Sequence, residues 1–456
     1  MIPTFRSDTG RRGRGRLVRL AGAAASVAVL GVLAACSSGP SAAAPSATAV
    51  PTVDPNQTYN ITYWSWTKAS QQAVDAFNAA HPRIHVTFEQ IPSGSAGGYA
   101  KISDAFKAGN GPDVFNAEYP NLPGFVAAGQ VADISGYIDP KLKAKYVPQA
   151  WDLTTLGGKT WAVPYDLGVQ VMYYRTDLFK KYGLSVPKTW DEYRATAQKL
   201  KAAAPDTYLT NYTVDSGAAL AAFSWQAGAQ WFSTSGDTWK VNFTDSASKK
   251  VASYWQGMID DGLVDKVSGA AQGYNADLAS GKIITQLSAS WQAAYIPGTL
   301  PDQSGLWAAA PMPSFDGKPA SGMLGGSSYA IAKSSKNIAA DVEFAQWMTS
   351  QTAAIQPRVQ GGGSSAFLSN SNAASVAKSN FTSTYYPSQN PYEVFPAVAK
   401  GLKPWTWGPT MTGTNVAMAN AAQGLGANAT VLQVLQAGQK DAMDEMKSMG
   451  LSAKAG

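Results

Sequence analysis

The chain has 456 residues, a formal net charge of +6, 14 tryptophans and one cysteine. A chain of this length exceeds what a single hydrophobic core normally serves, so we expect two lobes. Residues 1–35 contain six arginines and one aspartate, which leaves residues 36–456 with a net charge of +1. This charge gives no basis for nucleic-acid or membrane-surface binding, and a single cysteine excludes a disulfide within the chain.

Residues 1–35 have the pattern of an export signal. An arginine-rich stretch precedes an apolar run over 20–33, and the segment ends in Leu-Ala-Ala-Cys at Cys36. This ending resembles the lipobox of bacterial lipoproteins, in which the thiol takes a lipid and becomes the new N-terminus. We therefore predict a signal peptide over 1–35 and a lipid anchor at Cys36 on the extracytoplasmic face of the membrane. A plain signal peptide with an incidental cysteine is the alternative.

The next segment, 36–58, is predicted to be a flexible linker. It consists mainly of Ser, Ala, Pro and Thr with almost no bulky side chains. Such a composition cannot bury enough apolar surface to offset the entropy lost on ordering. We expect it to tether the folded part to the lipid.

After the linker, strand and helix patterns alternate. Residues 59–66 are aromatic and β-branched and predict a strand, and a helix follows that ends at Pro82. A second strand over 84–88 and a helix around 102–106 come next, and a Gly-Asn-Gly-Pro turn leads into a strand from Asp113. This alternation predicts an α/β fold with a largely parallel sheet.

The middle of the chain continues the same alternation. Residues 169–174 predict a strand passing from one lobe to the other. Thr189 and Glu192 have the spacing of a capping box at a helix start. Another helix is predicted over 251–259, and a strand over 329–332 is again followed by a helix. The chain has no fixed-period repeat, which excludes a solenoid.

Several short motifs occur in a characteristic order. They are Ile61-Thr62-Tyr63-Trp64, Gly111-Pro112-Asp113-Val114, Pro187-Lys188-Thr189-Trp190-Asp191-Glu192, Ser280-Gly281-Lys282 before Ser290-Trp291, and Gly325-Gly326-Ser327. The set resembles the family 1 extracellular solute-binding proteins, in particular actinobacterial sugar-binding lipoproteins of ATP-binding-cassette (ABC) importers. The likeness covers about 59–446. It departs at 361–365, where Gly-Gly-Gly-Ser-Ser replaces the Gly-then-Pro turn of many members.

The resemblance implies a two-lobed, type II periplasmic-binding-protein-like fold. Its sheets would be mixed but mainly parallel, with helices on both faces and a hinged cleft between the lobes. The implied first lobe is 59–168 plus about 328–385, and the second is 169–327 plus about 386–446. The resemblance also implies a monomer that binds a mono- or oligosaccharide and delivers it to membrane permease subunits of an ABC transporter.

The residues independently support a carbohydrate cleft. In open α/β sheets, ligands meet the loops at the carboxyl ends of the strands, and several of these predicted loops carry aromatic or acidic residues. Sugar rings stack on aromatic faces, while their hydroxyls need charged or amide partners. The predicted ligand-binding residues are Trp66, Tyr119, Asp166, Trp225, Trp291, Gly326, Ser327 and Trp405.

Each aromatic candidate has an alternative in packing. Trp64 and Trp66 share a strand face, and we expect Trp64 in the core and Trp66 in the cleft. Trp225 fits equally well in a buried helix. Tyr119 and Trp405 fit equally well in packed loops.

The polar candidates also have structural alternatives. Asp166 lies where the chain is predicted to cross between lobes, so it can form a turn beside the hinge. A tight turn alone would explain Gly326 and Ser327. Arg358 is expected to be a solvated charge at a helix end.

Catalysis has little support. The only histidines are His81 and His85, with Pro82 between them, which makes a metal triad or a Ser-His-Asp arrangement hard to assemble. We therefore predict a binding protein with no enzymatic activity, cofactor or metal. A lipid-anchored carbohydrate-cleaving enzyme with paired carboxylates is one alternative. The same fold binding a polyamine, peptide or metal chelate is another.

Overall fold

The computed structural model describes residues 50–456. The predicted signal peptide over 1–35, the predicted lipidation site Cys36 and residues 37–49 lie outside them. Residues 50–58, the end of the predicted linker, contain no helix or strand. None of the described helices is both long enough and apolar enough to cross a bilayer.

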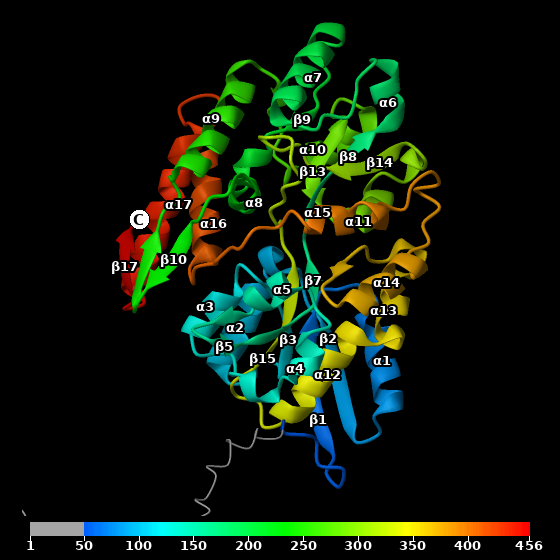
Figure 1. The fold of residues 1–456 in the computed structure, drawn as a ribbon, viewed down its shortest axis with the longest axis vertical. Helices are drawn as coiled ribbons and strands as arrows, with labels where there is room; N and C mark the ends of the chain where they lie inside the picture. Colours follow the sequence, from blue (N-terminus) through cyan, green and yellow to red (C-terminus); the bar gives the residue numbers. More distant parts are fainter. Residues whose placement is uncertain (1–49) are drawn as a thin grey trace, which may run out of the picture. The chain divides into compact units, whose positions relative to one another are not determined.

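The first sheet has five strands in the order β2-β1-β3-β15-β6 (Figure 1). These are β1 (Tyr59–Ser65), β2 (Ile84–Gln90), β3 (Val114–Glu118), β6 (Ala162–Pro164) and β15 (Ser327–Ile331). β1 is parallel to β2 and β3, because the chain crosses over through α1 (Ser70–Ala80) and α2 (Gly98–Ala108). β15 is antiparallel to β3 and β6.

The second sheet has three strands in the order β13-β8-β14. These are β8 (Gln170–Arg175), β13 (Thr285–Ala289) and β14 (Trp307–Pro311), and both neighbours are antiparallel to β8. β8 begins directly after Val169, in the connection between the sheets. β13 ends beside the same connection, where the Ser290 N–H donates to the Val169 carbonyl. The predicted α/β class with mixed sheets is therefore confirmed, but the parallel majority is wrong for this sheet.

Two segments that join the sheets, 165–169 and 321–327, lie side by side and are called the crossing segments below. The first contains β7 (Asp166–Leu167), which also pairs with β16 (Phe367–Leu368). Val169 forms an antiparallel bridge to Met323, and the Leu324 N–H donates to the Gly168 carbonyl at 2.8 Å. The two sheets are thus linked by a hydrogen-bonded pair of chains.

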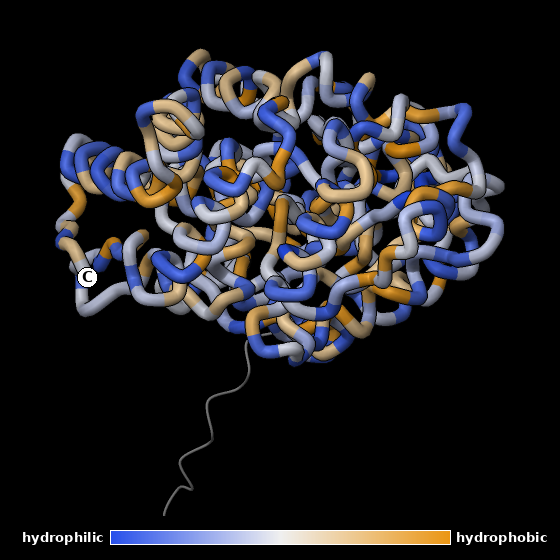
Figure 2. Tube along the Cα trace, turned by 90° about the horizontal axis from the view of Figure 1, so that it is seen from above, coloured by the Kyte–Doolittle hydropathy of each residue, from blue (hydrophilic) through white to orange (hydrophobic). Residues whose placement is uncertain are grey.

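Helices flank both sheets. α1 packs on α12 (Ile338–Ser350) and α13 (Thr352–Val359), and α13 packs on α14 (Ser371–Asn380). The helices near the second sheet are α7 (Trp190–Ala203), α8 (Gly217–Ala227), α9 (Ser246–Asp260), α16 (Met411–Ala422) and α17 (Val431–Ser448). The predicted capping box at the start of α7 is confirmed. Figure 2 shows hydrophilic and hydrophobic residues alternating along outer helices, as amphipathic packing requires.

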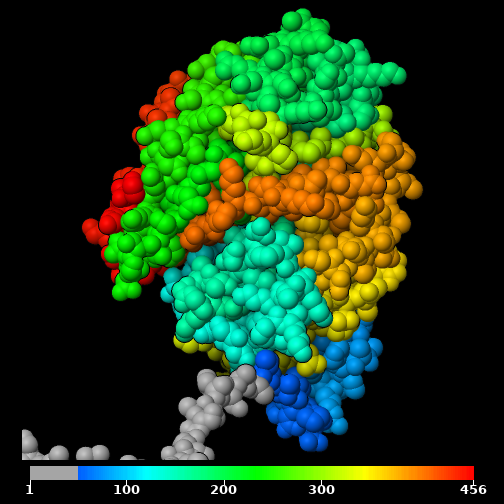
Figure 3. Space-filling model, in the orientation of Figure 1, coloured from blue at the N-terminus to red at the C-terminus, as the bar shows by residue number. Residues whose placement is uncertain are grey.

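Residues 381–410 connect α14 to α16. In Figure 3 this connection, in orange, lies across the surface between the cyan and green parts of the chain. Its Gly401 carbonyl accepts from the Ser321 N–H at 3.2 Å. Just beyond it, the Asn121 amide donates to the Thr412 hydroxyl at 2.7 Å. The connection therefore lies beside both a crossing segment and α3 (Leu122–Ala127).

Arg358 differs from expectation, because it is 1% exposed. Its guanidinium donates to the carbonyls of Ala354 and Met348 and to the Tyr329 hydroxyl. These bonds compensate for the loss of water, which is why a charge expected in solvent is tolerated inside.

The remaining elements are short or peripheral. The strands are β4 (Thr155–Leu156), β5 (Lys159–Thr160), β9 (Thr210–Asn211), β10 (Phe232–Ser235), β11 (Thr238–Val241), β12 (Val264–Asp265) and β17 (Ser452–Ala455). The helices are α4 (Pro140–Lys143), α5 (Pro148–Asp152), α6 (Thr176–Lys181), α10 (Gln272–Ser280), α11 (Gln292–Thr299) and α15 (Phe395–Ala399). Of these, α11 matters most for the site, because it begins directly after Trp291.

Candidate ligand-binding site

The candidate site is centred on Gly325, in the second crossing segment. A Cβ added to Gly325 would stand 3.2 Å from Glu118 Oε1 and 3.4 Å from Trp291 Nε1. Glu118 ends β3 of the first sheet, and Trp291 follows β13 of the second. A carboxylate from one sheet and an indole from the other therefore approach the same glycine, where a Cβ would be crowded.

Glu118 is held by a neighbouring tyrosine. The Tyr99 hydroxyl donates to Glu118 Oε2 at 2.5 Å and accepts from the Glu118 backbone N–H at 3.2 Å. Burial raises the pKa of the Glu118 carboxyl, and the bond from Tyr99 opposes part of that rise. Among the described residues Oε1 has no hydrogen-bond partner, so this oxygen can accept a hydrogen bond from a ligand hydroxyl.

Aromatic rings line both sides of this space. Trp66 meets Tyr99 edge to face, with ring centroids 5.8 Å apart, and Trp291 meets Tyr295 in the same way at 5.9 Å. Trp66 and Trp291 are only partly buried, and Tyr295 is 45% exposed. Lys68, two residues after Trp66, places its ammonium 5.1 Å from the Tyr295 ring centroid. This contact brings the Trp66 side and the Trp291 side of the site together.

The orientation of Trp291 is fixed by the backbone. Its indole N–H donates to the Leu324 carbonyl at 2.8 Å. Because the only polar atom of the ring is already used, the ring offers its apolar surface to a ligand.

Asp166 and Ser327 belong to the frame of the site. The Ser327 backbone N–H donates to Asp166 Oδ1 at 2.6 Å, and Asp166 is 6% exposed. Burial raises the pKa of Asp166 to about 7; the Ser327 N–H opposes the rise, and the charge of Glu118 adds to it. The charge of Glu118 therefore acts on Asp166, and Asp166 acts on the crossing segments through its hydrogen bond.

Gly326 is required for the close approach of the crossing segments. Its φ is +95°, and an added Cβ would stand 2.6 Å from Met323 Cε and 2.9 Å from the Gly168 nitrogen. Both the left-handed backbone and the lack of space favour glycine here.

Three aromatic candidates are buried, although one of them, Tyr119, lies directly beside Gly326. Tyr119 and Trp225 are 0% and 1% exposed, and Trp405 is 7% exposed. Trp225 stacks on Trp405 with centroids 5.2 Å apart, and its N–H donates to the Lys403 carbonyl at 2.8 Å. In this structure these three rings are thus packed against other side chains, and their contact with ligand stays a prediction. Trp66 and Trp291 are the candidates at the accessible centre.

Some residues of the site were not among the candidates. The sequence could have identified Glu118, because a carboxylate at the end of a predicted strand is a candidate by the same rule as Asp166. No sequence pattern identifies Tyr99, Tyr295 or Lys68, because their positions at the site depend on contacts between distant segments. Within 50–456, no three His, Cys, Asp or Glu side chains are grouped so as to hold a metal ion.

Comparison with known proteins shows which family and which proteins this chain resembles. The profile of the family described as "Bacterial extracellular solute-binding protein" matches residues 63–355. A lactose-binding protein of Rhizobium radiobacter is 29% identical over 310 residues, 62% of this chain and 69% of that protein. An arabinooligosaccharide-binding protein of Bacillus subtilis is 26% identical over 299 residues, 62% of this chain and 67% of that protein.

A solved structure is similar in fold. The galacto-N-biose-/lacto-N-biose I-binding protein of the ABC transporter from Bifidobacterium longum, in complex with lacto-N-biose, superposes with a TM-score of 0.77 and 24% identity. The match covers 88% of this chain and 100% of that one. The two-lobed α/β fold predicted from the sequence is therefore confirmed. Since the family profile spans well over half of the chain, this protein belongs to the bacterial extracellular solute-binding protein family.

Proposed function

We propose that this protein binds a carbohydrate at Gly325, between the two sheets, and delivers it to the permease subunits of an ABC importer. The observation that carries the proposal is the approach of Glu118, from one sheet, and Trp291, from the other, to the same residue, Gly325. A solute held there would touch elements of both sheets.

The chemistry of the site suits a sugar. The partly exposed rings of Trp66 and Trp291 offer apolar surface to the C–H faces of a pyranose. Glu118 Oε1 offers an acceptor for hydroxyl groups, and hydrogen bonds to a charged group contribute about 1.5–3 kcal/mol each. The lactose, arabinooligosaccharide and lacto-N-biose named for the similar proteins support the same ligand class.

Capture would follow from a hinge at the crossing segments. We assign 59–168 plus about 328–385 to one lobe and 169–327 plus about 386–446 to the other. A ligand that contacts both lobes only when they are close shifts the equilibrium toward the closed form. The closed, loaded form, acting as a monomer, would then be the one presented to the permease.

Binding without chemistry is part of the proposal. Hydrolysis of a glycosidic bond normally needs two carboxylates that reach the bond. Glu118 has a free oxygen, but Asp166, the carboxylate on which its charge acts, is 6% exposed and bonded to Ser327. Asp166 is therefore unsuited to be the second carboxylate.

Attachment to the membrane rests on the sequence alone. We propose that residues 1–35 are removed and that Cys36 carries a diacylglyceryl lipid, so that the folded part acts at the extracytoplasmic face. This proposal is independent of the sugar site, because residues 50–456 form one compact unit by themselves.

Calorimetry tests the sugar proposal. The chain from residue 37 onward is titrated with lactose, lacto-N-biose and arabinooligosaccharides, and the products are analysed for new reducing ends. Saturable binding of a sugar, lost in Trp291→Ala, supports the proposal. New reducing ends would instead indicate an enzyme, and binding of every sugar unaffected by Trp291→Ala would place the site elsewhere.

A further inference from the structure

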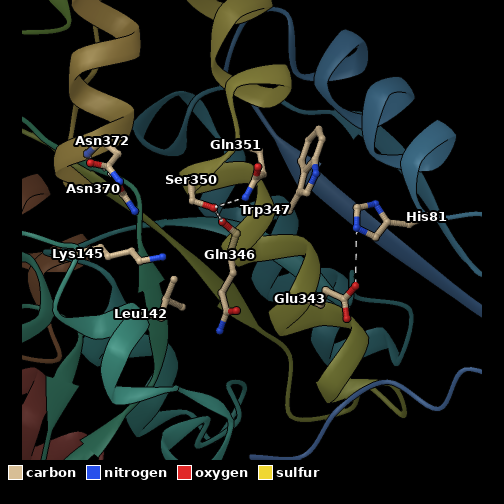
Figure 4. A pocket seen from close by; sticks show the side chains of 10 residues that line it. All are labelled: His81, Leu142, Lys145, Glu343, Gln346, Trp347, Ser350, Gln351, Asn370 and Asn372. Carbon is tan, nitrogen blue, oxygen red and sulfur yellow. Dashed lines mark hydrogen bonds and ion pairs between the residues drawn. The ribbon is translucent and has the colours of Figure 1, made fainter.

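A second polar pocket lies away from Gly325. Its volume is about 340 Å³, within the range of small-molecule sites. Figure 4 shows its lining side chains, which come from α1, α4, α12, the start of α14 and adjoining turns. They are His81, Leu142, Lys145, Glu343, Gln346, Trp347, Ser350, Gln351, Asn370 and Asn372. None of the residues discussed at the Gly325 site is among them.

One side of this pocket offers hydrogen-bond donors. Asn370 is 1% exposed and caps α14, where its Oδ1 accepts from the N–H groups of Asn372 and Ala373 at 3.1 and 3.2 Å. Because Oδ1 must face those N–H groups, the orientation of the amide is settled. Its Nδ2 is then a buried donor with no well-formed hydrogen bond among the described residues, and the Tyr146 hydroxyl is its polar neighbour.

A cation lies beside this donor. The backbones of 145–147 and 369–371 are joined, with the Ser371 N–H donating to the Lys145 carbonyl and the Val147 N–H to the Ser369 carbonyl. Lys145 is exposed and forms no ion pair within the described part of the chain. An unpaired ammonium, a buried amide donor and the N-terminal end of a ten-residue helix all favour an anion.

The opposite side offers hydrogen-bond acceptors. His81 Nδ1 lies 2.9 Å from the Phe77 carbonyl, which can only accept, so Nδ1 carries a proton. Its Nε2 lies 3.7 Å from Glu343 Oε1. The Glu343 carboxylate is an acceptor that suits the hydroxyl groups of a polyol, and the His81 ring is a second polar group beside it.

Trp347 lies between the two sides. Figure 4 shows Asn370 and Lys145 on one side of the pocket, His81 and Glu343 on the other, and the Trp347 ring between them. Trp347 is only partly buried, so its ring adds apolar surface to the wall. The pocket thus combines an anion end, a hydroxyl end and an aromatic wall.

We propose that this pocket is a second ligand site that takes a sugar acid about the size of one hexose ring. Its carboxylate lies at Lys145 and Asn370. Its hydroxyls lie at Glu343 and His81, and its ring lies beside Trp347. The site acts independently of the solute site at Gly325.

D-Glucuronate and D-glucose test this directly, because they differ only at the carboxylate carbon. The mature chain is titrated with each by NMR or calorimetry, and with acetate as a carboxylate that lacks hydroxyls. We expect saturable binding of glucuronate, at least about tenfold tighter than that of glucose or acetate, and unchanged in Trp291→Ala. Equal binding of acetate would reduce the pocket to a simple anion site and overturn the proposal. Loss of glucuronate binding in Trp291→Ala would also overturn it, by moving the ligand to the Gly325 site.

Two variants identify the anion end. Asn370→Asp keeps the capping oxygen, so the start of α14 should be retained, but it replaces the donor by an anion. Lys145→Gln removes the exposed charge. Each should weaken glucuronate binding about tenfold or more, whereas Lys141→Gln, a nearby exposed lysine outside the pocket, should change it by less than about twofold.

The outcomes are decisive even if one variant folds poorly. A melting curve for each variant reports on folding. If Asn370→Asp melts early, Lys145→Gln decides alone, since an exposed side chain is not part of the core. Wild-type affinity in Lys145→Gln, or an equal loss in Lys141→Gln, would refute the proposed site.

Discussion

The Ser327 backbone N–H and the Asp166 carboxylate are 2.6 Å apart, and this hydrogen bond ties together the two segments that cross between the sheets. Asp166 is 6% exposed, and burial raises its pKa to about 7. An aspartate in an unfolded chain titrates near 3.9. Between about pH 4 and pH 7 the folded state therefore retains a proton on Asp166 that the unfolded state has already lost.

The first prediction concerns this proton. A raised folded pKa contributes stability that is fully present below about pH 4 and is lost as the pH rises toward about 7. Asp166→Asn keeps an oxygen that can accept from Ser327 but cannot ionise. Its melting temperature relative to the wild type should therefore increase between pH 5 and pH 8, by on the order of a few °C. Asp206→Asn, at an exposed position, is the control. If the difference in melting temperature between variant and wild type does not change with pH for either variant, Asp166 does not retain a proton on folding.

The second prediction concerns the aromatic surfaces. Trp66→Ala and Trp291→Ala should each weaken sugar binding about tenfold or more, because each removes a ring from the proposed contact surface. Both side chains are partly exposed, so the fold should persist.

The matched control for Trp66 lies on the same strand. Trp64 is also partly buried but lies under the Lys101 ammonium, 5.0 Å from its ring centroid, rather than against Tyr99. Trp64→Ala should lower the melting temperature and leave the affinity unchanged. If Trp64→Ala abolishes binding in a folded protein, the ligand surface of this strand has been assigned to the wrong tryptophan.

The third prediction concerns Glu118. Glu118→Gln keeps the shape but removes the charge of the proposed hydroxyl acceptor, so affinity should fall about tenfold or more. Burial raises the pKa of Glu118, so wild-type affinity should decrease as the pH falls through that value. The Gln variant should lack this dependence. Glu89→Gln, at an exposed ion pair with Lys101, should behave like the wild type, and identical pH profiles for all three proteins would exclude Glu118 as the acceptor.

The fourth prediction distinguishes two effects of a side chain at Gly325, which are steric blocking beside Glu118 and Trp291 and strain of the left-handed backbone. Its φ is +74°, so Gly325→Ala adds both left-handed strain and a Cβ between Glu118 and Trp291. Gly129 has a φ of +67° and nothing within 4 Å of an added Cβ. Both alanine variants should lose similar stability, but only Gly325→Ala should lose sugar affinity in calorimetry. Equal affinities would show that the space beside Gly325 is not occupied by ligand.

The fifth prediction concerns the membrane anchor. Two acyl chains hold a protein firmly, whereas one gives only marginal residence. Cys36→Ala removes the only thiol of the chain and should release most of the protein from the membrane fraction, with sugar affinity unchanged. Full retention in the membrane fraction would falsify the lipoprotein assignment.

Local patterns predicted the elements that depend on neighbouring residues. The Thr189–Glu192 capping box and the first strand–helix–strand units are examples, because caps and hydrophobic periodicity act within a few residues. The antiparallel second sheet depends on the pairing of β13 with β8, two strands far apart in the sequence, and no local pattern encodes this pairing.

The site was only partly predictable for the same reason. Trp66 and Trp291 follow strands, so that rule predicted them as ligand contacts, and the structure leaves both partly exposed. The stacking of Trp225 on Trp405 joins segments 180 residues apart, and the bond from Tyr99 to Glu118 joins a helix to a strand end. The burial of Arg358 likewise depends on Tyr329 and Met348, which reach it from other elements.

The paired crossing segments also constrain any motion of the two lobes. Backbone hydrogen bonds link Leu324 to Gly168 and Tyr165 to Ser327, so the segments cannot slide past each other without breaking them. Bending the pair as a two-stranded ribbon keeps every one of these bonds. Capture of a solute would then cost little backbone bonding, and the torsional change would fall on two glycines of the ribbon. Gly322 lies near one end, and Gly325 lies between the bonded residues Leu324 and Ser327.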